Sequence, residues 1–501
     1  MLKKIIIVGA VALALILVLA LLAVFSRPEE DNQPELTTPQ AGTQTEGPSG
    51  PTTDVNGYEL DDIPSSVRFD GETVTFLVWS DATKVEFFYN DMDGDMIGDA
   101  IYERNLTVEE RLGVKLEFVT ETGHATQSAL TKKANNDIAS GANEYDIIGT
   151  YSLSVATMAL TGAFNDINTL PGINLSKPWW PDALVDQCTI NNKLYYCSGD
   201  ISTNLLWMMT ATYFNKSLIT KYGLEDPYTL VKNNQWTFDK LFEMTTGKYE
   251  DNGNGVVDAE DTFGFSLYDL NLDAYLTAAG FVALEKDSSG EIILSPTAAN
   301  ERMIDVLDKL KNWISLTNDV FVGGTNVREI FFQEKSIFHT DRVFIVAGKD
   351  NQETNKIEFS YGIVPQPKFN ANQDKFITNV GHPFTMYAIS TGTIANGNED
   401  TCANTLECLA SESYRKVTPM VFEQTMKIRY SDDDVASQMY DILRGNISFD
   451  LGRLYNDTIG NFYTSMRSVI LGKAASYSSL YKGLVNATNA GLKKINEAYY
   501  D

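Results

Sequence analysis

Thr73-Val-Thr-Phe-Leu-Val-Trp-Ser-Asp81 is the stretch that decides the fold class of this chain. Its apolar and β-branched residues predict a strand, and a second strand is predicted at Gly113–Phe118. Between them, Ile101, Val108 and Leu112 follow one another at spacings of seven and four, which places them on one face of a helix. We therefore expect a strand–helix–strand unit that opens an α/β fold with mostly parallel sheets flanked by helices.

The tip of the first strand carries an aromatic residue, Trp79, and a carboxylate, Asp81. In open α/β sheets, ligands bind at the carboxyl ends of the strands. After a predicted helix over Ala125–Ala142, the predicted strand Tyr145–Gly149 brings Tyr151 to the equivalent position. The pattern indicates a small-molecule site at this edge, although an enzyme and a binding protein can both begin in this way.

The size and charge of the chain restrict its function. At 501 residues it is too long for a single core, so we expect at least two lobes. It has 39 Lys and Arg against 67 Asp and Glu, a formal net charge of −28. Such a surface repels phosphate backbones, which excludes nucleic acid as a partner. It also argues against a strongly anionic ligand, whereas neutral and cationic ligands remain open.

The N-terminus has the pattern of a membrane segment. Lys3 and Lys4 precede 21 uninterrupted apolar residues, Ile5–Phe25, enough to span the roughly 30 Å hydrocarbon core of a bilayer. Residues 1–26 therefore predict an uncleaved anchor, with a cleaved secretory signal as the alternative. In both cases the remainder is exported and lies outside the cytoplasmic membrane. Residues 27–65 are rich in Pro, Thr, Gly and Gln, which predicts a disordered linker.

The chain has four cysteines: Cys188, Cys197, Cys402 and Cys408. The first two flank a predicted hairpin that turns at Asn191-Asn192. A tight two-residue loop would place the first cysteine opposite Tyr195, so a disulfide between them needs slippage or a wider turn. One disulfide and four free thiols remain alternatives. The other two lie six residues apart on different faces of a predicted helix and are not expected to pair.

Residues 250–261, Glu-Asp-Asn-Gly-Asn-Gly-Val-Val-Asp-Ala-Glu-Asp, resemble a calcium-binding loop. Gly255 at the sixth position permits the sharp bend, and Val257 at the eighth pins the loop to the core. The predicted ligands are Glu250, Asn252, Asn254, Val256, Asp258 and Asp261. Glu in the first and Asp in the last position depart from the usual pattern, so we expect weak affinity and a structural role. A polar hairpin without metal is the alternative.

Five stretches together resemble a known family: Gly94–Asn105, Val108–Phe118, Lys177–Trp180, Tyr213–Lys216 and Trp236–Lys240. They are similar to sequences of the extracellular solute-binding proteins of ABC importers, in the sugar-binding family that includes maltose-binding protein. The resemblance implies two α/β lobes that close over a ligand by a hinge motion. It places lobe one at residues 66–199 and 363–412, and lobe two at 200–362 and 413–501.

Sugar recognition requires flat apolar faces for stacking and planar polar groups for vicinal hydroxyls. The predicted site residues lie at strand tips and near the implied hinge crossings: Trp79, Asp81, Tyr151, Trp180, Trp207, Asp341, Arg342 and His382. Each has a structural alternative, because aromatic residues usually pack in cores and the pair Asp341-Arg342 fits a surface ion pair. Trp79 and Asp81 are the leading candidates.

The resemblance implies a non-enzymatic, monomeric binding protein whose partners are a solute, most simply a carbohydrate, and the permease subunits of an ABC transporter. The sequence contains no G-x-S-x-G, P-loop or H-E-x-x-H motif. A surface glycoside hydrolase remains an alternative, since two carboxylates suffice for that reaction. A ligand-sensing module without transport is a further alternative.

Overall fold

The computed structural model describes residues 52–347, 357–431, 433–474 and 476–500. Residues 50–501 form one compact unit, which is the part considered below. The predicted membrane segment, residues 1–26, and most of the predicted linker lie outside the described residues. Within the described part, no helix combines the length and the apolar character needed to cross a bilayer.

Sheet one contains four strands in the order β12-β3-β1-β2. They are β1 (Thr73–Trp79), β2 (Lys115–Glu121), β3 (Ile147–Tyr151) and β12 (Thr385–Ile389). The pairs β1–β2 and β1–β3 are parallel, and β12 is antiparallel to β3. The helix α2 (Met96–Leu112) joins β1 to β2 and buries Ile101, Val108 and Leu112, which confirms the predicted strand–helix–strand unit.

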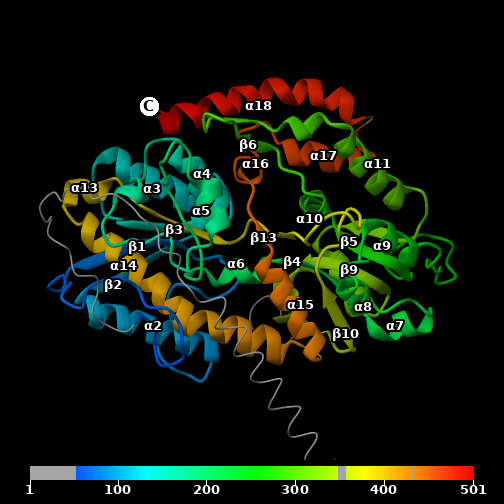
Figure 1. Cartoon of the computed structure of the whole chain (residues 1–501), viewed down its shortest axis with the longest axis horizontal. Helices are drawn as coiled ribbons and strands as arrows, with labels where there is room; N and C mark the ends of the chain where they lie inside the picture. Colours follow the sequence, from blue (N-terminus) through cyan, green and yellow to red (C-terminus); the bar gives the residue numbers. More distant parts are fainter. Residues whose placement is uncertain (1–51, 348–356, 432, 475, 501) are drawn as a thin grey trace, which may run out of the picture. The chain divides into compact units, whose positions relative to one another are not determined.

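Sheet two contains five strands in the order β10-β4-β9-β5-β8. They are β4 (Thr210–Asn215), β5 (Phe263–Tyr268), β8 (Val320–Gly323), β9 (Ser336–Arg342) and β10 (Tyr361–Val364). The strands β5, β8 and β9 are mutually parallel, whereas β4 is antiparallel to both β9 and β10. Each sheet therefore has a parallel group of three strands. The antiparallel strand is the edge strand β12 in sheet one and β4, between β10 and β9, in sheet two. Figure 1 shows the two sheets apart.

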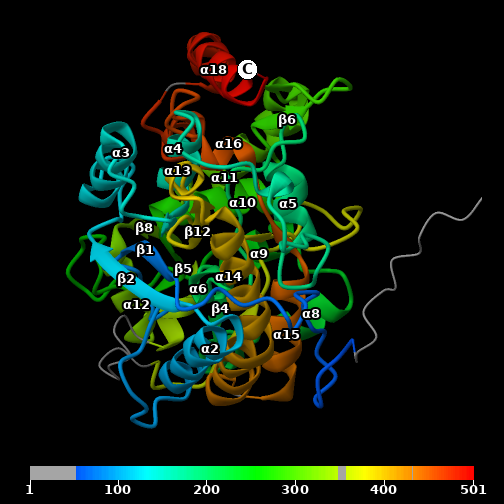
Figure 2. The ribbon, with the colours of Figure 1, turned by 90° about the vertical axis from the view of Figure 1, so that its left-hand side faces the viewer.

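Helices cover the sheets and form the C-terminal part of the unit. Among the described residues they are α3 (Ala129–Ser140), α4 (Ser152–Ala159), α5 (Asp182–Cys188), α6 (Thr203–Trp207), α7 (Lys216–Lys221), α8 (Pro227–Lys232), α9 (Phe238–Thr245), α10 (Leu272–Ala278), α11 (Glu301–Ser315), α12 (Arg328–Phe332), α13 (Gly392–Asn396), α14 (Glu399–Glu412), α15 (Asp434–Gly445), α16 (Leu451–Leu454), α17 (Phe462–Ile470) and α18 (Tyr477–Tyr500). Figures 1 and 2 place α18 on the side of the unit opposite α2.

Short strands and π-helical turns make the remaining connections. They are β6 (Leu284–Lys286), β7 (Ile292–Leu294), β11 (Thr378–Asn379), β13 (Ile447–Ser448) and the π-helical segments Ser413–Val417 and Pro419–Arg429. The chain leaves sheet one after β3, enters sheet two at β4, and returns to sheet one at β12. On that return, β11 pairs with β13 in parallel.

Several predicted boundaries move in the structure. The strand predicted at Tyr145–Gly149 runs instead to Tyr151, which is its last residue. The proposed start of the second segment of lobe one, residue 363, falls inside β10, which pairs with β4 of sheet two. These shifts arise because the hydrogen-bonded ladder, and not the hydrophobic run, determines where a strand ends.

The end of the predicted linker is part of the fold. Asp61 is paired with Arg111 at 2.5 Å, and Ile63 is 6% exposed. Lys177 lies 2.9 Å from Glu59 and 2.8 Å from Asp62. The linker prediction is therefore wrong for these residues, because specific ion pairs and a buried side chain fix a segment whose composition alone indicates disorder.

The hairpin region around the first two cysteines contains the predicted turn. Asn191 and Asn192 have positive φ angles of 49° and 58°, and a single antiparallel bridge joins Ile190 to Lys193. Cys188 and Cys197 are free thiols, and so are Cys402 and Cys408. All four are buried, which raises the pKa of each thiol and keeps it protonated.

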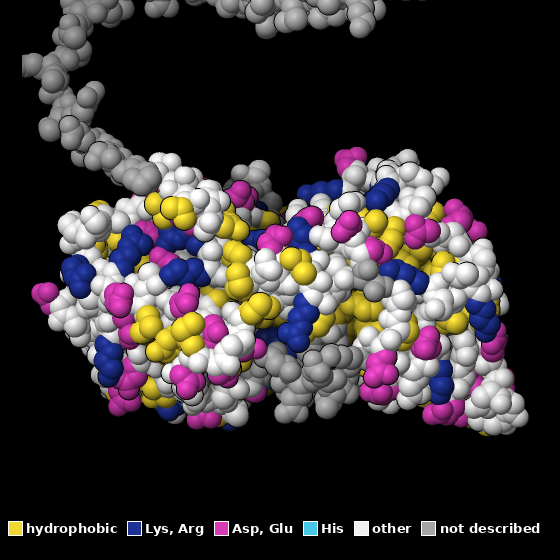
Figure 3. Space-filling model, turned by 90° about the horizontal axis from the view of Figure 1, so that it is seen from below, with side chains coloured by type: hydrophobic (Ala, Val, Ile, Leu, Met, Phe, Trp, Pro, Cys, Tyr) yellow, Lys and Arg dark blue, Asp and Glu magenta, His cyan; other side chains and the backbone are white. Residues whose placement is uncertain are grey.

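Charged side chains are spread over the surface. Figure 3 shows Asp and Glu interleaved with Lys and Arg on one face of the molecule, without one continuous acidic patch. The net charge of −28 is a sum over the whole chain, so the charge of a particular cleft has to be determined from its own residues.

Candidate functional site

The main candidate site is a cavity of about 1030 Å³. It collects residues that follow the carboxyl ends of parallel strands in both sheets, as expected for ligand sites in α/β folds. Its lining includes Ser80, Asp81, Ala82, Thr83, His124, Tyr151, Leu153, Tyr268, Leu270, Asn271, Asp273, Thr325, Asn326, Arg328, Glu329, Phe332, Arg342, Phe344, Asn379, Gly381, His382, Pro383, Arg453, Asn456, Asp457, Asn461, Tyr463, Thr464 and Arg467.

Sheet one supplies a wall of hydroxyl and carboxylate groups. Asp81 follows β1, and its carboxylate accepts hydrogen bonds from the backbone N–H groups of Gly123 (2.8 Å) and His124 (3.2 Å). Tyr151 ends β3, and burial raises the pKa of its hydroxyl to about 12. This wall therefore presents the carboxyl group of Asp81 and, at neutral pH, the neutral phenol of Tyr151 to a ligand.

Trp79 lies behind this wall and does not line the cavity. The indole is 1% exposed and donates from Nε1 to Oγ1 of Thr385 at 2.8 Å. Its ring centroid lies 6.0 Å from that of Tyr151 and 5.8 Å from that of His124, both lining residues. Trp79 therefore supports the wall through packing.

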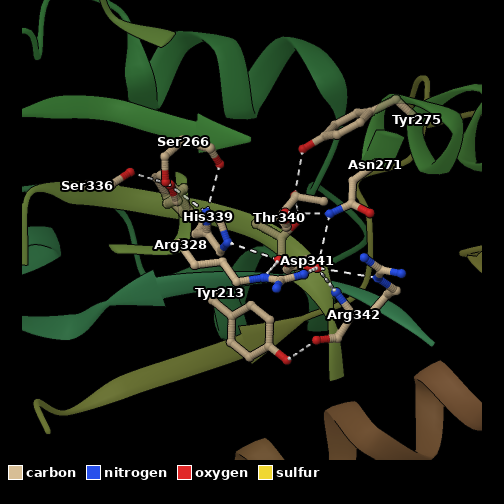
Figure 4. A network of polar contacts seen from close by, with 12 residues as sticks. Tyr213, Ser266, Asn271, Tyr275, Arg328, Ser336, His339, Thr340, Asp341 and Arg342 are labelled. Carbon is tan, nitrogen blue, oxygen red and sulfur yellow. Dashed lines mark hydrogen bonds and ion pairs between the residues drawn. The ribbon is translucent and has the colours of Figure 1, made fainter. Parts of the chain in front are cut away.

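Sheet two places a buried carboxylate beneath two arginines. Asp341 is wholly buried at the end of β9, and Figure 4 shows Arg328 and Arg342 converging on it. Nη2 of Arg328 lies 3.3 Å from Oδ1 of Asp341, and Asn271 donates to the same oxygen at 3.2 Å. Burial acts to raise the pKa of Asp341, but His339 and the two arginines outweigh it and lower the pKa well below its usual range.

Two aromatic rings accompany these arginines. The guanidinium of Arg342 lies 5.7 Å from the ring of Tyr268 and 5.3 Å from that of Phe344. The guanidinium of Arg328 lies 4.9 Å from Phe344, so both cations rest on aromatic faces. Gly381 allows the close approach of Arg342, because a Cβ added there would lie 2.7 Å from Cδ of the arginine. Sheet two therefore presents aromatic faces beside forked donors.

The segments around β11, α16 and α17 supply a third wall. Arg467 forms a bidentate ion pair with Asp273 at 2.6 and 2.7 Å. Arg453 donates to the carbonyl of Val380 at 2.8 Å, and its Nη2 lies 3.4 Å from Nε2 of His382. Burial and the charges of Arg453, Arg467 and Arg342 lower the pKa of His382 well below its ordinary value. This histidine is therefore neutral at pH 7.

Half of the predicted site residues line the cavity. Asp81, Tyr151, Arg342 and His382 do so, although they come from four separate parts of the chain. The other four are absent from the lining: Trp79, Trp180, Trp207 and Asp341. The alternative of a surface ion pair for Asp341 and Arg342 is wrong, because the carboxylate is completely buried.

The two tryptophans near the implied hinge crossing are core residues. Trp180 is 1% exposed and donates from Nε1 to Glu407 at 2.8 Å. Trp207 is also 1% exposed, and the ammonium group of Lys84 lies 5.3 Å from its ring centroid. In both, the polar or cationic partner belongs to the protein itself, and neither ring faces the cavity.

Sequence reasoning missed most of the aromatic and cationic lining. Tyr268 ends β5, so the rule that selected Asp81 and Tyr151 would have found it had that strand been identified. Phe344 follows β9 by two residues, but it is one of 25 Phe residues and has no local signal that distinguishes it. Arg453 and Arg467 belong to C-terminal helices and have no local signal, because tertiary contacts alone bring them to the cavity.

The predicted calcium loop has a different arrangement of polar contacts. Within the described residues, no three or more Asp, Glu, His or Cys side chains are grouped to hold a metal ion. The Glu250 carboxylate accepts from the hydroxyl of Tyr222 at 2.6 Å, and Asp261 accepts from the backbone N–H groups of Asn252 (2.9 Å) and Asp258 (3.1 Å). Calcium would have to compete with these bonds, and its binding stays a prediction.

No protein-family model matches this sequence, and no curated protein matches it. Solved structures do match. A cyclo/maltodextrin-binding protein complexed with maltotetraose has a TM-score of 0.52 and 13% identity, over 85% of this chain and 97% of that chain. A sugar transporter from Rhizobium etli in an open conformation has a TM-score of 0.51 and 12% identity, over 85% and 99%.

A third similar structure is an ABC transporter solute-binding protein from Agrobacterium radiobacter K84 in complex with ribitol. Its TM-score is 0.50 and its identity 13%, over 84% of this chain and 99% of that chain. Identities this low show the fold, and the match extends over nearly all of each related chain. The described part of this chain therefore has the same two-lobed α/β fold as these three structures.

Proposed function

We propose that this protein is a solute-binding protein that captures a carbohydrate in the cavity and delivers it to the permease of an ABC transporter. The observation that carries the proposal is the composition of the cavity, in which aromatic rings lie beside forked donors at the strand ends of both sheets. A partly exposed ring such as that of Tyr268 stacks on C–H-rich sugar faces, and planar groups bind vicinal hydroxyls, whereas Phe344 is 7% exposed and mainly supports the two arginines. With about 1030 Å³, the cavity is at the upper end of small-molecule sites.

Similar structures support a sugar or polyol as the ligand. Those of the same fold described above contain maltotetraose and ribitol. A cavity between two sheets also suits a closing motion, in which the lobes trap the solute and exclude water. The range of each lobe remains as proposed from the sequence, with the boundary at β10 corrected.

The lining carboxylates support binding over catalysis. Both carboxylate oxygens of Asp273 accept from Nη1 of Arg467, and Asp81 accepts from two backbone N–H groups. A glycoside hydrolase requires one carboxylic acid to donate a proton and a second carboxylate to act as base or nucleophile. Carboxyl groups already engaged by donors in this way are suited to binding and not to proton transfer, so we propose a non-enzymatic protein. We also propose a monomer, as the sequence resemblance implies.

We place this binding function on the outer face of the cytoplasmic membrane. The proposal rests on Ile5–Phe25, whose apolar length fits an uncleaved anchor. Membrane fractionation of cells that express the full chain should recover it with the membrane, at the mass of the uncleaved protein. Recovery of a soluble exported form that lacks the apolar segment would show that residues 1–26 are a cleaved signal and not an anchor.

Ligand binding is tested with the full-length chain, purified in detergent and mixed with a panel of oligosaccharides. Thermal-shift measurements identify ligands, calorimetry gives their affinities, and mass spectrometry follows the sugar. We expect a raised Tm, micromolar or tighter binding and an unchanged sugar. Shortened saccharide products would show a hydrolase instead, and normal binding without uptake in a transport assay would show a sensor.

A further inference from the structure

The charge of the cavity differs from that of the whole protein. The chain has a net charge of −28, yet the lining contains four arginines and no lysine: Arg328, Arg342, Arg453 and Arg467. Their side chains are only 9 to 18% exposed. Arginine is the residue that recognises carboxylate and phosphate groups by two parallel hydrogen bonds.

The four arginines form two pairs, Arg328 with Arg342 and Arg453 with Arg467, and each pair shares one carboxylate. Arg328 and Arg342 both lie against Asp341, but the Nε of Arg342 is 3.5 Å away and is a buried donor without a hydrogen bond among the described residues. This pair has one positive charge in excess. Its second member, Arg342, has an unfilled donor and rests on aromatic faces inside the cavity.

The second pair has the same composition. Arg467 takes both oxygens of Asp273 at 2.6 and 2.7 Å, which leaves Arg453 with a distance of 3.9 Å to that carboxylate. Nε of Arg453 is likewise a buried donor without a hydrogen bond in the described structure. Arg453 therefore has no close carboxylate of its own on the wall formed by α16 and α17, although the buried Asp450 also experiences its charge.

His382 lies between the two pairs. Besides burial, the charges of Arg453, Arg467 and Arg342 all lower its pKa, so arginines from both pairs act on the same point of the cavity. The remaining lining carboxylates are Asp81, Glu329 and Asp457, and all three are exposed to solvent. Water screens exposed charges more than buried ones, so the deep part of the cavity is positive and the rim is negative.

From this arrangement we propose that the ligand is an acidic saccharide, whose anionic group binds between Arg342 and Arg453 while its hydroxyls meet the exposed carboxylates. The proposal rests on the proposed function and specifies its substrate class. A sugar carboxylate, as in a uronic acid, would pair with the cavity-lining guanidinium groups of Arg342 and Arg453, whose positive charge the shared aspartates do not fully neutralise. The expectation from net charge, which argues against a strongly anionic ligand, is replaced by this local argument.

The test compares matched saccharides on the full-length chain by calorimetry. The acidic probes are trisaccharides of galacturonate, glucuronate and mannuronate, and their carboxyl-reduced counterparts are the neutral probes. We expect at least one acidic probe to bind 100-fold more tightly than its neutral counterpart, with the preference falling as salt rises. Trisaccharides that carry sulfate or phosphate groups in place of carboxylates form a separate arm. Tighter binding of these probes would overturn the sugar carboxylate and show that the arginines bind a different anion.

Two variants locate the effect. Arg342→Gln should weaken binding of the acidic probe at least tenfold and that of the neutral probe less than threefold, whereas Arg342→Lys should keep part of the preference. Arg68→Gln is the control, because Arg68 is an exposed arginine outside the cavity. Equal or tighter binding of neutral probes overturns the acidic ligand while the binding function stands. Absence of binding to every probe overturns both.

Discussion

Replacing Trp79 with alanine separates a packing role from a ligand-binding role. The side chain is 1% exposed and gives its N–H to Thr385 at 2.8 Å. A buried Trp removes about 200 Å² from water, which at about 25 cal/mol per Å² corresponds to about 5 kcal/mol. Core Trp-to-Ala replacements cost about 3–5 kcal/mol. We expect the free energy of unfolding to fall by this amount, and Thr385 also loses its donor.

The measurement is urea unfolding followed by circular dichroism, with calorimetry of the ligand found in the saccharide panel. The matched control is Tyr268→Ala, because this ring is only partly buried and lines the cavity. We expect the control to lose at least tenfold in affinity with a change in unfolding free energy below about 1 kcal/mol. If Trp79→Ala instead unfolds like the parent protein and loses binding tenfold, the packing role is refuted and Trp79 belongs to the site.

Three further predictions follow from the same contacts. Gly381→Ala should weaken ligand binding about tenfold by displacing Arg342, since its Cβ would lie 2.7 Å from Cδ; unchanged affinity in calorimetry would contradict this. His382 has a lowered pKa, so the unfolded chain binds its proton below about pH 6.5 while the native state does not. His382 should therefore contribute a loss of native stability as the pH falls below that value, by up to about 1.4 kcal/mol per unit; because buried carboxyls such as Glu407 contribute with the opposite sign, the measurement is the difference between the parent protein and His382→Gln in urea unfolding. If the loop at 250–261 binds calcium, terbium luminescence excited through Tyr249, which donates to Asp261 at 2.9 Å, should be displaced by millimolar calcium and be absent in Asp261→Asn.

Local sequence patterns predicted the elements that depend on neighbours in the chain. The spacing of Ile101, Val108 and Leu112 identified the buried face of α2, and the apolar run after residue 72 identified β1. Asp81 and Tyr151 were identified because residues at or just after the end of a parallel strand lie at the carboxyl edge of the sheet, where ligands bind. These predictions depend on periodicity and on a topological rule, both of which are present in a single sequence.

The direction in which a large side chain faces could not be obtained in the same way. The strand β1 is buried on both faces, so alternation does not distinguish the cavity side of Trp79 from its core side. Trp180 and Trp207 are residues of the type that stacks on sugars. In the structure, however, the indole N–H of Trp180 donates to Glu407, and the ammonium group of Lys84 lies over the ring of Trp207. Each of these rings contacts a residue more than a hundred positions away in the sequence, so local patterns do not show whether the ring is available to a ligand.

The sequence by itself determined the α/β class, the strand tip at Asp81 and the overall negative charge. Only the tertiary structure decided that the cavity is lined by arginines from sheet two and from the C-terminal helices. The physical reason is that charge acts through space: Arg342 and Arg453 are 111 positions apart in the numbering, yet both act on His382. The net charge of the chain contains no information about which arginines lie close together. That depends on how the two sheets and the C-terminal helices pack.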